Sequence, residues 1–354
     1  MRIIAIEEHW ASPGIEQALA AQPEADRDPS LVLSAIGDHA ARLAELGPTR
    51  LARMDALGID IAVLGLTPPG TQPLAAVDAV PLCREANDVA AQAVAAQPTR
   101  LRAFATLPTA DPDAAVAELE RATHQLGTVG VMVYGRTGAR PLDDPAFDEL
   151  LGAAAELGQP VFIHPQIPTR TIRDASYSGF DPAVELGLST FGWGWHLEAG
   201  LAALRLVLAG TFDRHPSLQI ILGHWGEMLL FWLDRVDSLS NVSPHLERRV
   251  ADYVRQNMFI TCSGMLEPRL ARHALDLTSI DRLLFSTDHP FAHVDAAGVE
   301  ALFASIPDAA DRERFAWANA AQLLRIDVGP DAELEEGLDA GGGSPPTARI
   351  SPGS

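Results

Sequence analysis

Short apolar segments alternate with longer amphipathic ones along most of this chain of 354 residues. Several of the short segments are apolar at every position, which is typical of parallel strands buried on both faces. The longer segments repeat their apolar residues with the period of an α-helix. The predicted strands span residues 2–7, 61–66, 102–107, 129–134, 160–164, 218–223, 257–262 and 282–286. The predicted helices span residues 48–57, 78–97, 111–126, 146–157, 196–211, 226–240, 266–276, 293–306 and 309–324. Eight strands that alternate with helices predict an α/β protein with a closed (β/α)8 TIM barrel.

Two insertions and a tail interrupt this alternation. Residues 13–47 follow the first predicted strand and residues 166–195 follow the fifth. Both insertions leave the C-terminal ends of strands, where the loops of such barrels build active sites. Residues 328–354 are rich in Gly, Pro, Ser and Asp and offer no apolar face, which predicts a disordered tail. We therefore expect one barrel domain over residues 1–327.

Several predicted strands end in a residue that can bind a metal. Glu7 and His9 close the first strand, and alternation along a strand places both side chains on one face. His164 closes the fifth strand and Asp288 follows the eighth. The first and eighth strands of a closed barrel are neighbours, so two imidazoles and two carboxylates can surround one Zn2+ or Mn2+ ion. For each residue taken alone, the alternative is an ordinary hydrogen bond in a loop or turn.

His224 closes the sixth strand and faces the same mouth of the predicted barrel. Glu227 follows it in the first turn of a predicted helix. An acid there also complements the helix dipole, so a functional and an ordinary role are equally open for Glu227.

Three further residues are candidates for a substrate pocket. Trp193 and Trp195 lie at the end of the second insertion, where they could form pocket walls or pack beneath the loop. Arg235 precedes Asp237 by two positions, and a surface ion pair on a helix is the alternative for it.

Composition excludes several classes of function. The net charge of −21 argues against nucleic-acid binding, which needs a basic face. All 26 basic residues are arginine, so neither Schiff-base catalysis by lysine nor a carbamylated lysine between two metals is possible. Two cysteines are too few for a disulfide framework. The N-terminus lacks a signal-peptide pattern and no apolar run is long enough for a membrane span, which predicts a cytoplasmic protein.

The motifs at the strand ends resemble those of a known family. They are Glu7-Glu8-His9, Ile163-His164-Pro165, Gly192-Trp193-Gly194-Trp195-His196-Leu197-Glu198, Phe212-Asp213-Arg214-His215-Pro216, Gly223-His224-Trp225-Gly226-Glu227 and Phe285-Ser286-Thr287-Asp288-His289-Pro290-Phe291. In this order and spacing, over residues 1–325, they resemble the amidohydrolase superfamily branch of aminocarboxymuconate-semialdehyde decarboxylase and the γ-resorcylate, salicylate and 2,3-dihydroxybenzoate decarboxylases. The resemblance implies a metal-dependent hydrolase type of (β/α)8 barrel. Glutamate in place of histidine at the start of the first motif resembles the hydroxybenzoate decarboxylases.

The resemblance also implies roles for individual residues. The metal ligands would be Glu7, His9, His164 and Asp288. His224 would act in catalysis with support from Glu227, and Arg235 would lie near the substrate or at a subunit contact. His289 and Met265 depart from the pattern of many relatives, and both would reshape the substrate pocket.

These features lead to the hypothesis of a carboxy-lyase that decarboxylates an ortho-hydroxylated aromatic acid. One divalent metal would chelate the carboxylate and the adjacent hydroxyl, and Asp288 would protonate the ring carbon. We expect a homodimer or homotetramer. One alternative is a metal-dependent hydrolase of a lactone or amide. The other is an inactive binding barrel.

Overall fold

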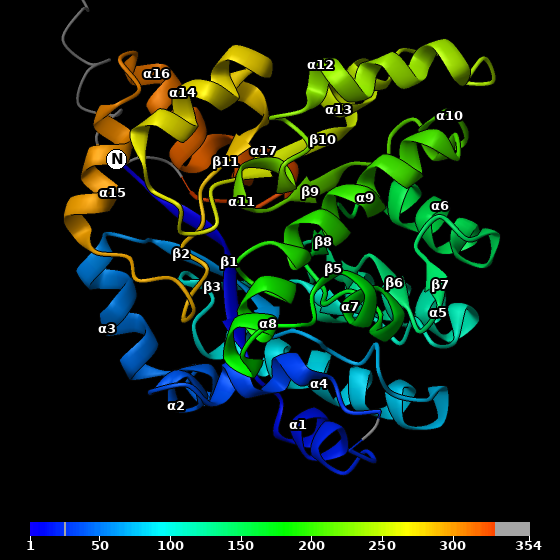
Figure 1. The fold of residues 1–354 in the computed structure, drawn as a ribbon. Coiled ribbons are helices and arrows are strands. Elements are labelled where there is room, and N and C mark those ends of the chain that lie inside the picture. The colour runs from blue at the N-terminus through cyan, green and yellow to red at the C-terminus, as the bar shows by residue number, and fades with distance from the viewer. Residues whose placement is uncertain (25, 330–354) are drawn as a thin grey trace, which may run out of the picture.

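Parallel strands form a closed barrel at the centre of the protein, and helices surround them (Figure 1). The computed structural model describes residues 1–24 and 26–329. The strands of the barrel are β1 (Ile4–Trp10), β2 (Ile61–Leu66), β3 (Leu101–Ala103) with β4 (Ala105–Thr106), β5 (Val131–Tyr134), β8 (Val161–His164), β9 (Ile220–Leu222), β10 (Met258–Thr261) and β11 (Leu283–Leu284). They follow one another around the barrel in sequence order, so the predicted fold is confirmed.

Two seams close the sheet into a barrel. At one seam the backbone N–H of Phe104 donates to the carbonyl of Leu64 (2.9 Å), which joins β2 to the segment between β3 and β4. At the other seam the backbone N–H of Ile6 donates to the carbonyl of Phe285 (3.1 Å). The backbone N–H of His9 likewise donates to the carbonyl of His289 (2.7 Å). The first and last strands are therefore neighbours, as expected for a (β/α)8 barrel.

Apolar side chains fill both faces of the strands. The interior of the barrel is packed by residues that include Ile4, Ile6, Val63, Phe104, Phe162 and Leu284. A larger cluster lies between the strands and the outer helices. Burial on both faces explains why the strands read as continuous apolar runs in the sequence.

The helices of the outer ring occupy most of the predicted positions. They are α3 (Pro48–Leu57), α4 (Ala76–Ala96), α5 (Pro112–Arg121), α6 (Asp148–Leu157), α9 (Gly194–Leu208), α13 (Val250–Asn257), α14 (Pro268–Leu277) and α15 (Ala296–Ala304). The final helix runs through α16 (Ala309–Glu313), η6 (Arg314–Ala318) and α17 (Asn319–Leu323). The remaining elements are η2 (Ala122–Leu126), β6 (Arg136–Thr137), β7 (Arg140–Pro141), η3 (Pro145–Phe147), α10 (Thr211–Arg214), α11 (His224–Glu227), α12 (Leu233–Val236), η4 (Asp237–Val242) and η5 (Ile280–Arg282).

The predicted helix over residues 226–240 is wrong. The chain after β9 instead forms the one-turn α11, then a turn, then the short α12 and η4. Backbone φ is positive at every residue from His224 to Met228, so a right-handed helix cannot begin there.

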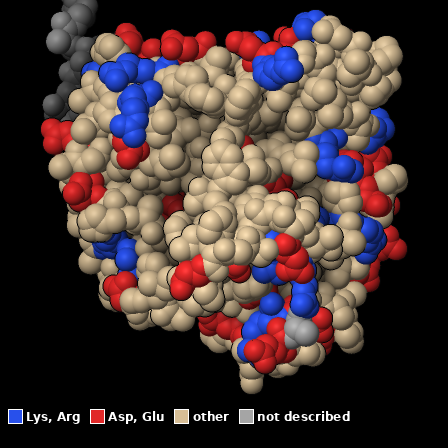
Figure 2. Space-filling model, in the orientation of Figure 1, with Lys and Arg blue, Asp and Glu red and all other residues tan. Residues whose placement is uncertain are grey.

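Both insertions contain short helices. The first holds α1 (Pro13–Ala20), η1 (Pro29–Ala35) and α2 (His39–Ala44), and the second holds α7 (Arg170–Ser176) and α8 (Pro182–Ser189). α7 and α8 lie on the near side of the barrel in Figure 1. In the same view, Figure 2 shows mostly uncharged side chains over the centre of this face and charged ones toward its edge. The insertions therefore cover the end of the barrel where the candidate site lies.

Most of the tail predicted over residues 328–354 lies outside the described residues, which end at Gly329. Within the described ranges, none of the helices has both the length and the apolar character needed to cross a bilayer.

Candidate metal centre and active site

The C-terminal ends of the barrel strands surround a cavity of about 560 Å3. Its lining comes from the ends of β8, α9, β9, β10 and β11 and from the first insertion. The lining residues with ionisable side chains are His39, His164, His196, His224 and Asp288. Among the described residues that line the cavity there is no arginine, so an anionic ligand must find positive charge elsewhere.

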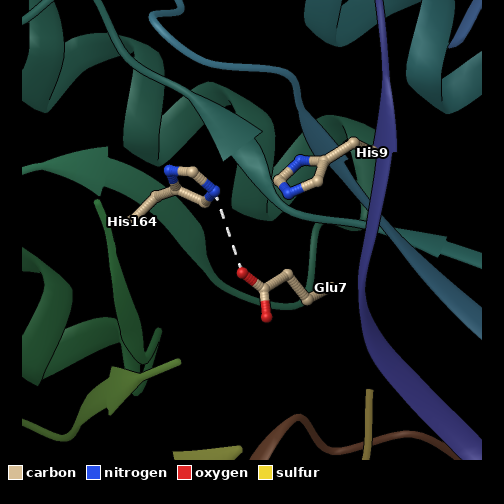
Figure 3. Close-up of side chains that lie close together, drawn as sticks. All are labelled: Glu7, His9 and His164. Carbon is tan, nitrogen blue, oxygen red and sulfur yellow. Dashed lines mark ion pairs between the residues drawn. The ribbon is translucent and has the colours of Figure 1, made fainter. Parts of the chain in front are cut away.

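The side chains of Glu7, His9 and His164 lie close together at the C-terminal ends of β1 and β8 (Figure 3). Their potential ligand atoms all lie within 4.8 Å of one another, and all three side chains are buried. Asp288 joins them, since its Oδ1 lies 3.3 Å from His9 Nε2. The structure therefore brings together all four predicted ligands, because strand alternation turns Glu7 and His9 to the same side.

Glu7 is buried next to a second carboxylate, that of Asp288. Burial and the nearby charge of Asp288 raise the pKa of its carboxyl to about 7. Ser263 donates a hydrogen bond to Oε2, while Oε1 has no hydrogen-bond partner among the described residues. A buried carboxylate with one free oxygen is suited to a cation.

His164 is held as a neutral imidazole with one free nitrogen. Burial and the charge of His9 lower the pKa of His164 to about 3. Its Nδ1 donates to the carbonyl of Pro165 at 2.8 Å, so the lone pair is on Nε2, which lies 3.8 Å from Glu7 Oε1. A neutral imidazole with its other nitrogen hydrogen-bonded to a carbonyl is the usual form of a metal-binding histidine.

The ring nitrogens of His9 also indicate a metal site. Neither of its ring nitrogens makes a hydrogen bond with another described residue, although the side chain is fully buried. Buried polar atoms in native proteins almost always have partners. Free atoms on Glu7 and His9, a neutral His164 and the ionised Asp288 together fit one divalent cation.

The backbone that carries these ligands is itself tied down. Glu8 points away from the cavity and accepts hydrogen bonds from Thr287 N (3.0 Å) and Thr287 Oγ1 (2.7 Å). Arg50 Nη2 donates to the carbonyl of His9 at 2.6 Å. These contacts clamp β1 to the residues after β11 and so hold His9 next to Asp288.

A second cluster lies beside the first, and its members are already paired. Glu227 is fully buried and binds two histidines, with Oε1 2.8 Å from His224 Nδ1 and Oε2 2.8 Å from His196 Nδ1. Contacts with His224 and His196 together outweigh burial and lower the pKa of Glu227 to about 2. Contacts with Glu227 and Asp288 together outweigh burial and raise the pKa of His224 well above the usual range. Hydrogen bonds satisfy this cluster, so it does not call for a second metal.

His196 connects Glu227 to the backbone of the second insertion. Its Nδ1 faces the Glu227 carboxylate, and its Nε2 lies 3.0 Å from the carbonyl of Phe191. Both partners accept hydrogen bonds, so His196 holds Glu227 and the Phe191 backbone in fixed positions.

His224 links the two clusters. Its Nε2 lies 3.9 Å from Asp288 Oδ2, and its backbone N–H donates to Ser263 Oγ at 2.8 Å. Contacts with His224 and His9 outweigh burial and hold the pKa of Asp288 well below its usual range. Asp288 is therefore ionised, with a charged imidazole close by.

The segment from His224 to Met228 adopts left-handed backbone conformations, which cost roughly 1–2 kcal/mol per residue. Gly223 makes the turn possible, because a Cβ there would come within 2.7 Å of Ser263 Oγ and 3.0 Å of Glu227 Oε1. The interpretation of Glu227 as an ordinary acid in the first turn of a helix is therefore wrong. The turn carries Glu227 back under His224, a strained arrangement typical of functional sites.

Three predicted substrate-binding residues lie outside the cavity. Trp195 lines it, but Trp193, Arg235 and His289 are not among the described residues that do so. Trp193 is 44% exposed, and Arg235 is exposed on α12. The structure therefore does not place these three residues at the cavity formed by one chain.

His289 does not line the cavity, although it directly follows Asp288. It pairs with Glu8 across the seam, whereas Asp288 before it has a positive φ of 55°. Burial and the charges of Arg50 and Arg42 lower the pKa of His289 to about 3, so its Nδ1 accepts a hydrogen bond from Arg42 (3.2 Å). Its contacts are structural.

Four members of the site were not predicted from the sequence: His39, His196, Ser263 and Phe291. Phe291 packs between the rings of His9 (5.6 Å between centroids) and His39 (5.2 Å). Ser263 directly follows the predicted strand over residues 257–262, and His196 and Phe291 stand in two of the motifs that carried the resemblance. His39 lies in the first insertion, where no pattern indicates which side chains turn inward.

The fold and the site define a metal-dependent barrel, and comparison with known proteins specifies its family. The sequence profile of the amidohydrolase family matches residues 38–326. The chain is 36% identical to γ-resorcylate decarboxylase of Rhizobium sp. (strain MTP-10005), over 92% of this chain and 98% of the relative. The chain belongs to the amidohydrolase family.

Two solved structures show how far the similarity extends. A dihydroxybenzoic acid decarboxylase from Polaromonas sp. JS666, with bound manganese and the inhibitor 2-nitroresorcinol, is 32% identical with a TM-score of 0.77. A variant of 5-carboxyvanillate decarboxylase from Novosphingobium aromaticivorans, with bound manganese and 3-methoxy-4-hydroxy-5-nitrobenzoic acid, is 31% identical with a TM-score of 0.85. Each match covers 92% of this chain and 97% of the other. The resemblance stated from the motifs is thereby confirmed.

Proposed function

We propose that this protein is a metal-dependent decarboxylase of an ortho-hydroxylated aromatic acid. The observation that carries the proposal is the buried cluster of Glu7, His9 and His164, whose free ligand atoms lie at the base of a cavity. Asp288 and His224 face the same cavity and can handle a proton. The relatives named above are decarboxylases, one of them of a dihydroxybenzoic acid.

Glu7, His9, His164 and Asp288 would hold one divalent ion, Mn2+ or Zn2+. When bound, the ion supplies positive charge that binds the substrate carboxylate and its neighbouring hydroxyl oxygen. Ser263 keeps one oxygen of Glu7 occupied, which leaves the other free for the ion.

Asp288 would deliver the proton to the ring carbon that bears the carboxylate. Because Asp288 is ionised, it must first receive that proton, and the charged His224 lies close by, with Nε2 3.9 Å from Asp288 Oδ2. Glu227 stabilises the charged form of His224, which keeps a proton available. Protonation of the ring carbon breaks aromaticity, and loss of CO2 returns the bonding electrons to the ring. The reaction therefore needs no organic cofactor.

The proposal is tested by incubating metal-loaded protein with a panel of hydroxybenzoates and measuring CO2 release. Release of CO2 from at least one ortho-hydroxylated acid is the expected result. Hydrolysis of lactones or amides without CO2 release would instead identify a metal-dependent hydrolase. A protein that binds no divalent metal would be an inactive barrel.

One tightly bound divalent metal per chain is expected after purification without chelator. Among the described residues, Glu7 and His9 have buried ligand atoms without a hydrogen-bond partner, whereas His196 and His224 are paired with Glu227, and the chain has no lysine that could bridge a second ion. Elemental analysis measures the stoichiometry, and Glu7→Gln should lower it. Two ions per chain would contradict the single site.

Replacement of His196 with leucine is expected to lower kcat/KM about tenfold to a hundredfold, because one buried oxygen of Glu227 then lacks a donor. His196→Asn can still donate one N–H and should recover most of the loss. His245→Leu, which removes an exposed imidazole bound to the carbonyl of Leu208, is the control. Equal kcat/KM for wild type and the leucine variant, with only a lower Tm, would show that His196 is merely structural.

We further infer a cytoplasmic homodimer or homotetramer in which Arg235 lies at the subunit contact. Arg235 follows Phe231 and Trp232, whose side chains are 67% and 53% exposed. Exposed aromatic side chains next to arginine are typical of interfaces. Light scattering measures the assembly, and a monomer at micromolar concentration would contradict the inference.

A further inference from the structure

The cavity is larger than a single aromatic ring requires. Its volume is about 560 Å3, whereas an apolar cavity of roughly 150 Å3 holds benzene. The ligand cluster and a small aromatic acid would therefore occupy only the inner part of the space. The remaining part opens toward solvent.

Aromatic side chains mark the inner part of the cavity. The ring of Trp195 lies 6.3 Å from that of His164, and the ring of Phe291 lies 5.6 Å from that of His9. These two side chains border the ligand cluster on different sides. A substrate ring bound at the cluster would lie between apolar walls.

The outer part is apolar as well, although it is exposed. Ile36, Phe191 and Met265 line the cavity and are 51%, 61% and 39% exposed. They come from three separate loops, which follow β1, β8 and β10. Single exposed apolar residues are ordinary, but three that converge on the mouth of one cavity indicate a ligand site.

The backbone of this rim is held in place. The carbonyl of Met265 accepts a hydrogen bond from Trp225 Nε1 at 2.8 Å. The carbonyl of Phe191 accepts one from His196 Nε2, and the Phe191 ring lies against Gly187, where a Cβ would come within 3.3 Å of it. A preformed rim loses little conformational entropy when it binds a ligand.

We propose that the outer part of the cavity is a subsite for an apolar substituent of the substrate, such as an alkyl chain or a second ring. This proposal rests on the proposed function, since the occupant is an extension of the aromatic acid held at the cluster. Ile36, Phe191 and Met265 at the rim carry no charge, so they favour an apolar substituent. The substrate class is an ortho-hydroxylated aromatic acid with a hydrophobic extension.

The test compares 2-hydroxybenzoate with methyl, propyl and pentyl derivatives substituted at each remaining ring position. Metal-loaded protein is assayed for CO2 release, and calorimetry measures Kd for 2-nitroresorcinol and its alkyl derivatives. For at least one ring position, Kd should fall and kcat/KM should rise by up to about fourfold for each buried methylene. No gain with chain length at any position would overturn the subsite.

Variants of the rim residues test whether the outer part of the cavity causes the dependence on chain length. Met265→Ser and Ile36→Ser should each reduce the dependence on chain length, measured as the ratio of pentyl to unsubstituted ligand. Val77→Ser, which changes a residue on α4 that is 79% exposed, is the matched control and should keep the wild-type ratio. A ratio unaffected by both rim variants would overturn the proposal.

Two further outcomes separate the subsite from the activity. If none of the acids releases CO2 but the nitroresorcinols still bind more tightly with longer chains, the proposed function fails and the subsite stands. If the acids react equally well at every chain length, the function stands and the subsite fails. Rim variants that change the mass in light scattering but not the chain-length ratio would overturn the subsite and show that a second copy of the chain covers the rim.

Discussion

Replacement of Asp288 with asparagine is expected to lower turnover by about a thousandfold or more while the fold remains intact. The amide cannot deliver a proton to the ring carbon, and it is a weaker ligand than a carboxylate. Asp288 has a positive φ of 55°, a conformation that asparagine adopts as readily as aspartate, so the backbone should not change. CO2 release at saturating metal, with circular dichroism and metal content measured in parallel, checks this result.

The control for this variant is Asp276→Asn, which alters an exposed carboxylate on α14. It should keep the wild-type rate. A turnover of Asp288→Asn within tenfold of wild type, with full metal occupancy, would show that another group protonates the ring.

The second large effect is the loss of activity that we expect when the substrate has no hydroxyl ortho to its carboxylate. Acids with a hydroxyl ortho to the carboxylate should react, whereas benzoate and 3-hydroxybenzoate should react more than about a hundredfold more slowly. Benzoate lacks the second oxygen anchor, and it lacks the electron donation that makes the ring carbon basic enough to accept a proton. Both losses act on the same transition state, so their effects on kcat/KM combine.

Binding of the unreactive acids is the necessary control. Calorimetry with benzoate and 3-hydroxybenzoate distinguishes failure to bind from failure to react. Similar rates for benzoate and 2-hydroxybenzoate would exclude anchoring through two oxygens. Activity confined to lactones or amides would assign the protein to the hydrolase alternative.

The electrostatics of the cavity agree with an anionic substrate in spite of the net charge of −21. Two ligand carboxylates, Glu7 and Asp288, would balance a divalent ion, so the centre alone has little net charge. His224, whose pKa Glu227 and Asp288 raise well above the usual range, adds a positive charge at the cavity. The protein thus attracts an anion locally without an arginine in the described lining.

The barrel could be predicted from the sequence because its strands are buried on both faces. Continuous apolar runs such as residues 61–66 and 160–164 are too short for most helices, and their alternation with helices leaves few possible topologies. Prediction failed for residues 226–240, where left-handed conformations at non-glycine residues follow the strand. No local propensity favours such a turn, and it persists because surrounding contacts hold it.

The metal cluster was also determined by the sequence. Glu7, His9, His164 and Asp288 stand at strand ends, and the barrel brings parallel strand ends to one rim whatever the details of packing. Alternation over Glu7, Glu8 and His9 accounts for the two side chains that face the cavity and for the one that does not. Only the structure shows the irregularity in β1 between Ala5 and Glu8, which lets Ile6 face the barrel interior and Glu7 the cavity. The rule does not extend to His289, because Asp288 before it has a positive φ and is not extended.

Only the tertiary structure decided which groups complete the site. His196 meets Glu227 because α9 packs beside the strained turn after β9, and these residues are 31 positions apart. Phe191, Ile36 and Met265 converge on one mouth although each belongs to a different loop. Strand ends are placed by backbone hydrogen bonds that every sequence shares, so their side chains can be assigned from the pattern of residues. Loop side chains are placed by packing between distant segments, and that packing has no period that the sequence could display.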